Sequence, residues 1–483
     1  MMPMSPYLSV PQQDLSRIHQ MGVDILMEIG IKTDHVWIRE RLADRGCHLE
    51  GARVFIPTDL IDTTLQDIPG SFSVYGRQLD TFITVGPGNI FGINTGIFPN
   101  IYDLDSGRIR RSTLDDVKNT TRLMDALEYL HAVYVSLVDA TDLPAHMVTV
   151  SDFAAVLSNT TKPLIGPGVT NQVEAEAIVN IASAVRGGDK ERLRKYPVCV
   201  PFICPISPLF FPKDIVDALV CVAESGLPLI ALTNPVMGLT APYTIAATVA
   251  LGHAEFLASA VIAHTVSPGL PILNQNTPSV ADMRTLASTT GGPETGLIRQ
   301  MTVSLSNHLG IPSCAHGHTS SARLDYQAAA EKTLNGLLIA LARPSLLGGL
   351  GGLANATLTS YESILIDNEG YGAIFRTLAG VQVDEDHLAF NTIQEMMESG
   401  EVLTNEHTLR FLRSDEVWTP RLAVRQGLVG GSAVTEDYIE RASTVTRKLL
   451  DSHTVEALDK KIQLEIDAIL DSYDRSHSGR HRS

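Results

Sequence analysis

The chain has 483 residues, of which 44% are hydrophobic and 19% are charged, so it can build a large core and is unlike a disordered chain. Its formal net charge is −17, from 37 Lys and Arg against 54 Asp and Glu, which argues against the basic surface that binds nucleic acids. Five cysteines without a CxxC pair do not make a disulfide framework, and the N-terminus lacks the basic and apolar stretches of a secretory signal. We therefore expect a soluble cytoplasmic protein that binds no nucleic acid.

Residues 1–111 are predicted to form an N-terminal α/β cap. Residues 11–70 carry apolar positions at helical spacing, such as Ile38 and Leu42. Residues 71–111 instead alternate between apolar and polar positions and contain Gly- and Asn-rich turns, which predict β-hairpins.

From residue 112 onward, strand and helix patterns alternate. Seven short apolar runs bounded by Gly or Pro are typical of buried parallel strands: residues 132–138, 163–166, 198–203, 228–232, 271–273, 311–314 and 344–347. This order predicts a TIM (β/α)8 barrel over residues 112–383, with the eighth strand near the hairpins or after Thr357. A doubly wound open sheet is the competing fold. Residues 384–474 are predicted to be a helical C-terminal extension, and residues 475–483 a disordered basic tail.

The longest apolar stretch covers residues 244–266. It is interrupted by His253, Glu255 and His264. Charged and titratable groups are costly inside a bilayer, so the stretch is predicted to be a buried helix and not a membrane span.

In a barrel, the working residues follow the strands at their carboxyl ends. Four loops at these positions are neutral, aromatic and rich in amides: residues 201–212, 234–244, 274–278 and 315–320. This composition favours a small cation or a neutral ligand over a phosphorylated one. Four aromatic side chains either form a box for a quaternary ammonium group or belong to the ordinary core: Phe202, Phe210, Phe211 and Tyr243.

Cys314, His316 and His318 alternate at a predicted strand end, which places them on one side of the chain. They are either part of a zinc site, ligand contacts without a metal, or structural residues. No fourth metal ligand suggests itself in the sequence, so no metal site is assigned.

The segment from Gly349 to Ala354 satisfies the pattern G-x-G-x-x-A. A dinucleotide site would need an acidic strand end further on, and none follows. Close approach of the backbone to a flat ligand or a protein partner fits better, because glycine removes the intervening side chains.

Five segments, in this order and spacing, carry a resemblance to a known family: residues 206–209, 235–242, 293–294, 325–332 and 365–369. From about residue 20 to 450 the chain resembles the trimethylamine methyltransferase (MttB) superfamily. The resemblance implies a TIM barrel that transfers a methyl group from a methylamine to the Co(I) corrinoid of a separate small protein. Members that act on trimethylamine carry pyrrolysine, whereas residues 317–322 here are all standard amino acids. The chain thus resembles the branch whose members demethylate quaternary amines such as glycine betaine.

The chemistry of a quaternary ammonium group agrees with this branch. Its nitrogen has no lone pair to capture and leaves directly as a neutral amine. The protein need only hold the cation, align one methyl group with cobalt and exclude water. No nucleophile–base pair is visible in the sequence, and this reaction requires none.

The resemblance and the loop composition together give a set of expected site residues. Three aromatic side chains cage the cation: Phe202, Phe210 and Tyr243. Four polar side chains orient the rest of the substrate: Ser207, Thr240, Asn274 and Asn276. Arg323 is the candidate for a substrate carboxylate, and His316 and His318 border the reacting methyl group as catalytic residues. Three glycines form the edge that the corrinoid approaches: Gly349, Gly351 and Gly352.

Two segments depart from the family pattern at the barrel mouth. Residues 354–356 are Ala-Asn-Ala where an acidic residue, Ser and Gly are usual, and residues 321–323 are Ser-Ala-Arg in place of Asp-Ala-Lys. Two other functions remain open: a metal-assisted lyase or hydrolase using Cys314, His316 and His318, and a non-catalytic betaine-binding protein. We expect a homo-oligomer with no tightly bound cofactor, the corrinoid arriving on its partner protein.

Overall fold

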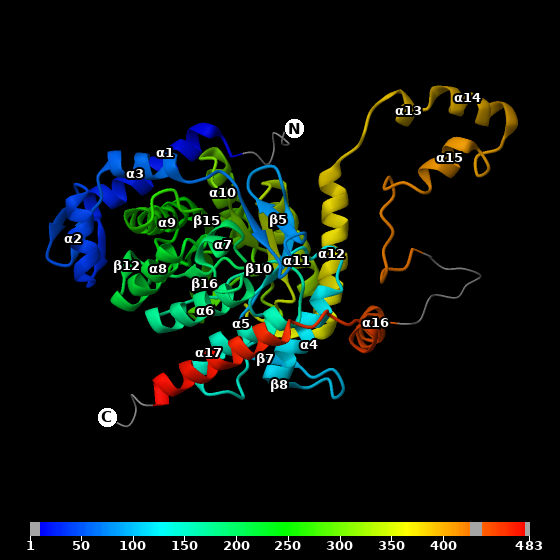
Figure 1. Cartoon of the computed structure of the whole chain (residues 1–483). Coiled ribbons are helices and arrows are strands. Elements are labelled where there is room, and N and C mark those ends of the chain that lie inside the picture. Colours follow the sequence, from blue (N-terminus) through cyan, green and yellow to red (C-terminus); the bar gives the residue numbers. More distant parts are fainter. Residues whose placement is uncertain (1–9, 426–436, 479–483) are drawn as a thin grey trace.

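The computed structural model describes residues 10–425 and 437–478. Eight short strands lie at its centre: β6 (Phe91–Asn94), β9 (Val133–Tyr134), β10 (Leu164–Ile165), β11 (Phe202–Ile203), β13 (Leu229–Thr233), β15 (Ile272–Asn276), β18 (Cys314–His316) and β19 (Leu346–Leu350). A long helix follows each strand in the chain: α4 (Leu114–Asp125), α5 (Val148–Ser158), α6 (Gln172–Val185), α8 (Lys213–Ser225), α9 (Ile245–Val266), α10 (Pro293–His308), α11 (Tyr326–Leu341) and α12 (Tyr361–Ala379). The helices lie outside the strands (Figure 1). The predicted α/β alternation is confirmed, and each of the seven predicted runs overlaps a strand, although the run 311–314 shares only Cys314 with β18.

The central strands are neighbours in chain order. Parallel ladders join β9 to β10, β11 to β13, β13 to β15, and β18 to β19. Single parallel bridges connect these groups: Ile93 with Ala132, Gly168 with Phe202, and Asn274 with Ser313. The last strand, β19, pairs in parallel with the first, β6.

β6 is the eighth central strand, which the sequence analysis placed either near the hairpins or after Thr357. It lies within residues 71–111, the region predicted to form hairpins, and so before the predicted start of the barrel at residue 112. Its partner β19 is more than 250 residues away in the chain. At Gly92, a Cβ atom would lie 2.1 Å from the Tyr129 carbonyl oxygen, so only glycine fits at that point of the strand.

The hairpin of β4 (Phe72–Tyr75) and β5 (Phe82–Val85) covers the inner face of the central strands, which is the side away from the helices. Its inward side chains form one buried cluster with residues from seven of the central strands and with Val200, just before the eighth, β11: Phe72, Val74, Ile83, Val85, Ile93, Ala132, Tyr134, Ile165, Val200, Ile230, Leu273, Cys314 and Leu346. All thirteen side chains are buried, so they fill the space between the hairpin and the central strands. The cluster is apolar apart from the Tyr134 hydroxyl and the Cys314 thiol.

Several shorter elements surround this centre. The N-terminal ones are α1 (Gln12–Asp24), η1 (Ile25–Ile29), β1 (Ile31–Thr33), α2 (Val36–Asp44), β2 (His48–Glu50), β3 (Arg53–Phe55) and α3 (Thr58–Asp67). Insertions between the central elements are β7 (Asn100–Tyr102), β8 (Ile109–Arg111), η2 (Ala145–Met147), α7 (Lys190–Lys195), β12 (Phe210–Phe211), β14 (Val236–Met237), β16 (Ser279–Asp282), β17 (Ala287–Thr289) and β20 (Leu358–Ser360). β12 pairs with β1, so the loop after β11 is tied to the N-terminal region.

Helix α9 is long and apolar enough to cross a bilayer, but it is packed inside the protein. It contacts α1, α8, α10 and the strands β13 and β15. Glu255 and His264, two of the residues that interrupt it, accept or donate hydrogen bonds within the chain. The prediction of a buried helix at this position is confirmed.

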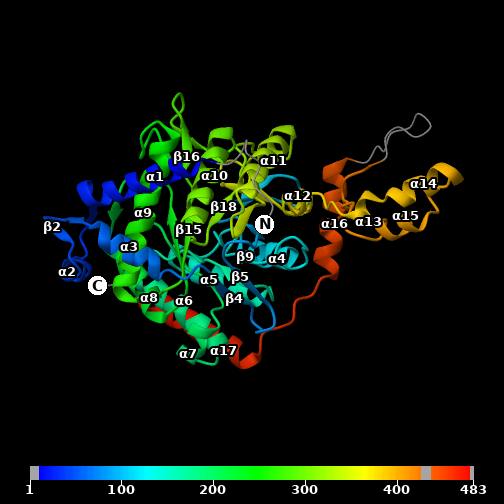
Figure 2. The ribbon, with the colours of Figure 1, turned by 90° about the horizontal axis from the view of Figure 1, so that it is seen from above.

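The C-terminal region leaves the body and returns to it. Helices α13 (Glu385–Leu388), α14 (Phe390–Ser399) and α15 (Glu406–Phe411) stand away from the body in both views (Figures 1 and 2). The chain returns where the Glu369 carboxylate accepts hydrogen bonds from the backbone N–H groups of Arg421, Leu422 and Ala423. Helix α16 (Tyr438–Ser452) then packs on α12, and α17 (Lys460–Ser478) packs on α6. Because α17 continues to Ser478, the first residues of the tail predicted to be disordered are helical; residues 479–483 lie outside the described part.

Candidate active site

A buried polar cluster lies toward the carboxyl ends of the central strands; it adjoins the apolar cluster and shares Tyr134 and Cys314 with it. Gln275 of β15 donates from Nε2 to the Tyr134 hydroxyl and to His316 Nε2, each at 3.2 Å. The Cys314 thiol is 3.3 Å from the same His316 nitrogen. His318 Nε2 is 2.8 Å from the Thr95 hydroxyl. We refer to these side chains as the histidine cluster: Thr95, Tyr134, Gln275, Cys314, His316 and His318.

Aromatic and imidazole rings form one wall of the histidine cluster. The Tyr134 ring stacks on Phe202 at 5.8 Å between centroids and meets His316 edge-on at 5.4 Å. The His316 and His318 rings are 5.7 Å apart. Ring faces of this kind attract a cation through their quadrupoles, so the cluster suits a positively charged ligand.

Both imidazoles are held neutral. Burial, reinforced by the nearby Arg299 cation, lowers the pKa of His316 to about 3 and that of His318 well below its usual value. Burial also raises the pKa of the Cys314 thiol and of the Tyr134 hydroxyl. At neutral pH the histidine cluster therefore carries no charge that would repel a cation.

Arg299, on α10, is the charged group beside this cluster. Its side chain is buried, and Nη1 donates to the His316 backbone carbonyl. Burial lowers its pKa to about 10, which still leaves it protonated at pH 7. Within residues 10–425 and 437–478, no carboxylate forms an ion pair with it. A buried cation without an anionic partner is costly, which points to an anionic group supplied from outside the chain.

Several buried polar atoms here have no hydrogen-bond partner among the described residues: Gln275 Oε1, Arg299 Nε, His316 Nδ1 and His318 Nδ1. Buried polar atoms in folded proteins are nearly always paired. Four unpaired ones in a single region, with both donors and acceptors present, are typical of a ligand site.

The structure brings three of the predicted substrate and catalytic residues together: Phe202, His316 and His318. The predicted glycine edge adjoins them. At Gly352, a Cβ atom would lie 2.9 Å from the Thr95 side chain, and at Gly349 one would lie 2.1 Å from the Gly317 carbonyl. Gly351 adjoins Leu137 in the same way. These glycines are required by the packing of the chain itself around the histidine cluster.

Asn274 and Asn276 do not reach the cluster. Side chains alternate along a strand, and in β15 it is Leu273 and Gln275 that face inward. Asn274 instead donates to Ser306 on α10 at 2.9 Å, and Asn276 lies against Gly252 on α9.

The remaining predicted residues lie elsewhere. The Phe210 ring in β12 is 5.5 Å from Lys32 Nζ of the N-terminal region. Thr240 accepts a hydrogen bond from the Val236 backbone within its own turn. Tyr243 is 58% exposed, and Arg323 is exposed as well.

Ser207 donates to Glu255 of α9 at 2.8 Å, and the Leu209 backbone N–H donates to the same carboxylate at 3.0 Å. Burial raises the pKa of Glu255 to about 7, and these two hydrogen bonds oppose the shift. Because the pKa is higher in the folded chain than in the unfolded chain, the protonated side chain stabilises the fold at low pH. This contribution is lost as the pH rises through about 7.

We expect the substitution Glu255→Gln to flatten the pH dependence of stability. Relative to this variant, the wild type should lose about 3 kcal/mol of unfolding free energy between pH 4.5 and pH 8. Denaturant titrations at a series of pH values measure the difference. The exposed substitution Glu398→Gln is the control; equal slopes for wild type and Glu255→Gln would contradict the prediction.

Thr95, Tyr134, Gln275 and Arg299 were not singled out from the sequence. Arg299 had a readable signal, since it is the only Lys, Arg, Asp or Glu between Glu294 and Arg323. Side chains of a strand alternate between its two faces, and the sequence does not show which face of β15 points inward. With that information, Gln275 is the site residue to expect in place of Asn274 and Asn276.

The segment that departs from the family pattern adopts an unusual backbone conformation. Ala354, Asn355 and Ala356 have φ values of 48°, 54° and 65°, in the left-handed region that favours glycine. The Asn355 side chain accepts a hydrogen bond from the Thr290 backbone at 3.0 Å, and its own N–H donates to the Thr319 carbonyl. These bonds fix the loop beside the site.

Among the described residues, no group of three or more His, Cys, Asp or Glu side chains is placed to hold a metal ion. Cys314 and His316 make one contact with each other, while His318 turns to Thr95.

The fold is shared with a methyltransferase of known structure. The crystal structure of the Methanosarcina barkeri monomethylamine methyltransferase (MtmB) superposes with a TM-score of 0.55 at 12% identity, covering 93% of this chain and 89% of that one. A family model described as trimethylamine methyltransferase (MTTB) matches residues 2–477. The chain therefore belongs to the trimethylamine methyltransferase family and is a methyltransferase.

Relatives of known function cover nearly the whole chain. The glycine betaine methyltransferase of Desulfitobacterium hafniense (strain Y51) is 27% identical over 466 residues, 96% of each chain. The trimethylamine methyltransferase MttB of Desulfitobacterium hafniense (strain DSM 10664 / DCB-2) is 28% identical over 464 residues, 95% of this chain and 92% of that one. The resemblance predicted from the sequence motifs is confirmed.

Proposed function

We propose that this enzyme transfers a methyl group from a small, carboxylated quaternary ammonium compound, such as a betaine, to the Co(I) corrinoid of a separate protein. Family membership and the similarity to a glycine betaine methyltransferase support the reaction class. The observation that carries the substrate class is the pairing of a buried, unpaired Arg299 with a neutral wall of rings. A betaine supplies both the anion and the cation that this arrangement lacks.

Each end of the substrate has a partner in this proposal. The Arg299 guanidinium binds the carboxylate through charge-assisted hydrogen bonds. The trimethylammonium group lies against the rings of Tyr134 and Phe202. The neutral His316 and His318 border the reacting methyl group and fix its direction through their contacts with Gln275 and Thr95. Arg299 thus takes the role first assigned to the exposed Arg323.

The reaction balances without a base. The carbon–nitrogen bond breaks, its electron pair stays on nitrogen, and a neutral tertiary amine leaves. Co(I) supplies the two electrons of the new cobalt–carbon bond and becomes Co(III). The chain contributes alignment, exclusion of water and a neutral surround for the methyl group.

We further infer that the eight central strands form a closed (β/α)8 barrel whose carboxyl end receives the corrinoid protein. The parallel pairing of β19 with β6 supports closure. Four large exposed apolar side chains on the loops after β13 and β15 support docking at this end: Leu239, Tyr243, Met283 and Leu286. The glycine edge of residues 349–352 lies beside the histidine cluster on the same side.

The test mixes the purified enzyme with a Co(I) corrinoid and a panel of betaines, and follows cobalt methylation by absorbance. Fast methylation with betaines and slower but measurable methylation with tetramethylammonium is the expected result. No methylation with any quaternary amine, in the presence of a corrinoid that a characterised relative can methylate, would overturn the proposal.

A further inference from the structure

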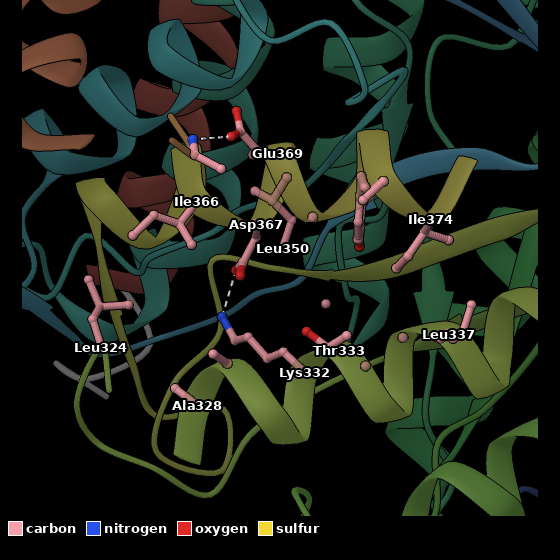
Figure 3. A pocket seen from close by; sticks show the side chains of 18 of the residues that line it. Leu324, Ala328, Lys332, Thr333, Leu337, Leu350, Ile366, Asp367, Glu369 and Ile374 are labelled. Carbon is pink, nitrogen blue, oxygen red and sulfur yellow. Dashed lines mark hydrogen bonds and ion pairs between the residues drawn. The ribbon is translucent and has the colours of Figure 1, made fainter. Parts of the chain in front are cut away.

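A deep groove lies outside the central strands, between helices α11 and α12. Its volume is about 630 Å³. The Lys332 ammonium and the Asp367 carboxylate meet across it at 2.6 Å (Figure 3). Apart from this pair, the walls are mainly apolar, and they carry small residues at helical spacing: Ala328, Ala329, Gly336, Gly370 and Ala373. Small residues on the two helices leave room in this groove for several large side chains of a partner.

The segment of α13, α14 and α15, which we call the arm, has the opposite character. None of the residues in these three helices is buried. Eleven large apolar side chains of residues 381–417 are exposed: Val381, Val383, Leu388, Phe390, Ile393, Met397, Val402, Leu403, Leu409, Leu412 and Val417. On α14, Phe390, Ile393 and Met397 share one face, and they are 75%, 55% and 81% exposed. A short helical segment with no buried side chain gains little stability from apolar packing in the free chain.

We propose that the arm packs on a second copy of this chain, with the apolar face of α14 lying in the groove between α11 and α12 of that copy. The two surfaces are complementary, because one is a projecting apolar helix and the other is an apolar trough lined with small residues. A second copy is also the one partner that is always present together with the arm.

Contacts within the chain hold the two ends of the arm together and brace its interior. At its root, Arg376 donates to the backbone carbonyls of Gly380 and Glu416, which fixes both ends of the arm. Inside the arm, His407 Nε2 is 2.9 Å from the Asp386 carbonyl and Arg410 pairs with the Asp386 carboxylate. The arm is thus a braced unit that stands away from the body in both views (Figures 1 and 2).

The arm begins just after α12, and α12 also lines the groove. This closeness favours a two-fold dimer in which each copy inserts its arm into the groove of the other. Ile374 and Thr377 of α12 line the groove, and the arm leaves α12 a few residues later. Trp418 and Tyr438, on the returning chain, also line it. A two-fold axis beside this root would let each arm reach the groove of the other copy, giving two identical contacts.

The apolar area of the arm matches what such a contact needs. A fully buried apolar side chain removes roughly 60–120 Å² from water. The eleven side chains are 43–82% exposed, so burying their exposed parts would supply on the order of 400–900 Å² per arm, and a standard interface uses about 800 Å² per partner. Two exchanged arms double the buried area.

The test compares molar masses of the full-length chain by light scattering. We expect the wild type to be a dimer or a multiple of one, and Phe390→Glu and Met397→Glu to shift it to monomer. Ala329→Glu, in the groove, should do the same. Ser399→Glu, on the opposite face of α14, is the matched control and should leave the assembly intact. A monomeric wild type, or an assembly that survives all three substitutions, would overturn the proposal.

Disulfide trapping distinguishes an arm that packs on the groove of a second copy from an arm that folds back onto the groove of its own chain. Chains carrying Met397→Cys are mixed with chains carrying Ala329→Cys and oxidised, with Glu395→Cys replacing Met397→Cys in the control mixture. The expected result is a covalent dimer that forms in the first mixture only when the Met397→Cys chain and the Ala329→Cys chain are both present. A disulfide that forms only within a single chain carrying both substitutions would show that the arm closes on its own groove, and would overturn the proposal.

Discussion

The substitution Arg299→Met should lower kcat/KM for a carboxylated betaine by about 10²-fold while changing kcat/KM for tetramethylammonium little. A hydrogen bond to a charged group contributes about 1.5–3 kcal/mol, which corresponds to this factor. Met keeps much of the volume of the arginine stem and removes the charge. Initial rates of corrinoid methylation with the two substrates give the ratio.

The stability of the same variant separates a binding role from a structural one. Arg299 is a buried cation to which the part of the chain that the structure describes supplies no carboxylate partner, so its removal should leave the melting temperature unchanged or raise it. Addition of a betaine should raise the melting temperature of the wild type but not that of Arg299→Met. An equal loss of activity on both substrates, together with a lower melting temperature, would contradict the assignment of Arg299 to the carboxylate.

The substitution Lys332→Met should destabilise the fold by about 3 kcal/mol. The Lys332 and Asp367 side chains are each only 12% exposed. Without the ammonium group, the Asp367 carboxylate keeps one hydrogen bond at that oxygen, from the Gly351 backbone N–H at 2.7 Å. Breaking one side of a buried pair leaves an uncompensated charge, which is the costly case. Urea denaturation of wild type and variant measures the change.

The double variant Lys332→Met with Asp367→Leu is the companion experiment. It removes both charges, so most of the lost stability should return. If the double variant is as unstable as the single one, the loss comes from packing in the groove and not from the charge. A single variant within 0.5 kcal/mol of the wild type, a change of roughly the size seen for surface substitutions, would also refute the expectation.

The strands and helices were largely readable because buried parallel strands are short apolar runs bounded by Gly and Pro. Residues 228–232 and 271–273 illustrate this, since β13 and β15 lie there. β6 lacked the signal: its sequence is Phe-Gly-Ile-Asn, it follows turns that predict hairpins, and its partners come from distant parts of the chain. Local patterns cannot report a pairing that only the tertiary fold creates.

The sequence predicted in part which residues gather at the candidate site. His316, His318 and Phe202 lie together in the structure because they belong to the ends of strands, which gather at one edge. Asn274 and Asn276 were chosen over Gln275 because composition does not reveal which parity of a strand faces inward. Ser207 and Phe210 were misplaced because the loop after β11 turns back to pair with β1, a long-range contact that leaves no trace in the loop itself.

The hairpin of β4 and β5 covers the inner face of the central strands, and this has a kinetic consequence for the proposed reaction. In the proposed closed barrel, Phe72, Val74, Ile83 and Val85 would fill one end, so donor and acceptor would both have to enter at the carboxyl end. A bulky corrinoid protein seated there blocks passage, so the amine has to enter first and the demethylated product has to wait until the protein departs. Initial-velocity patterns should therefore be those of a compulsory-order mechanism, with the amine as the leading substrate.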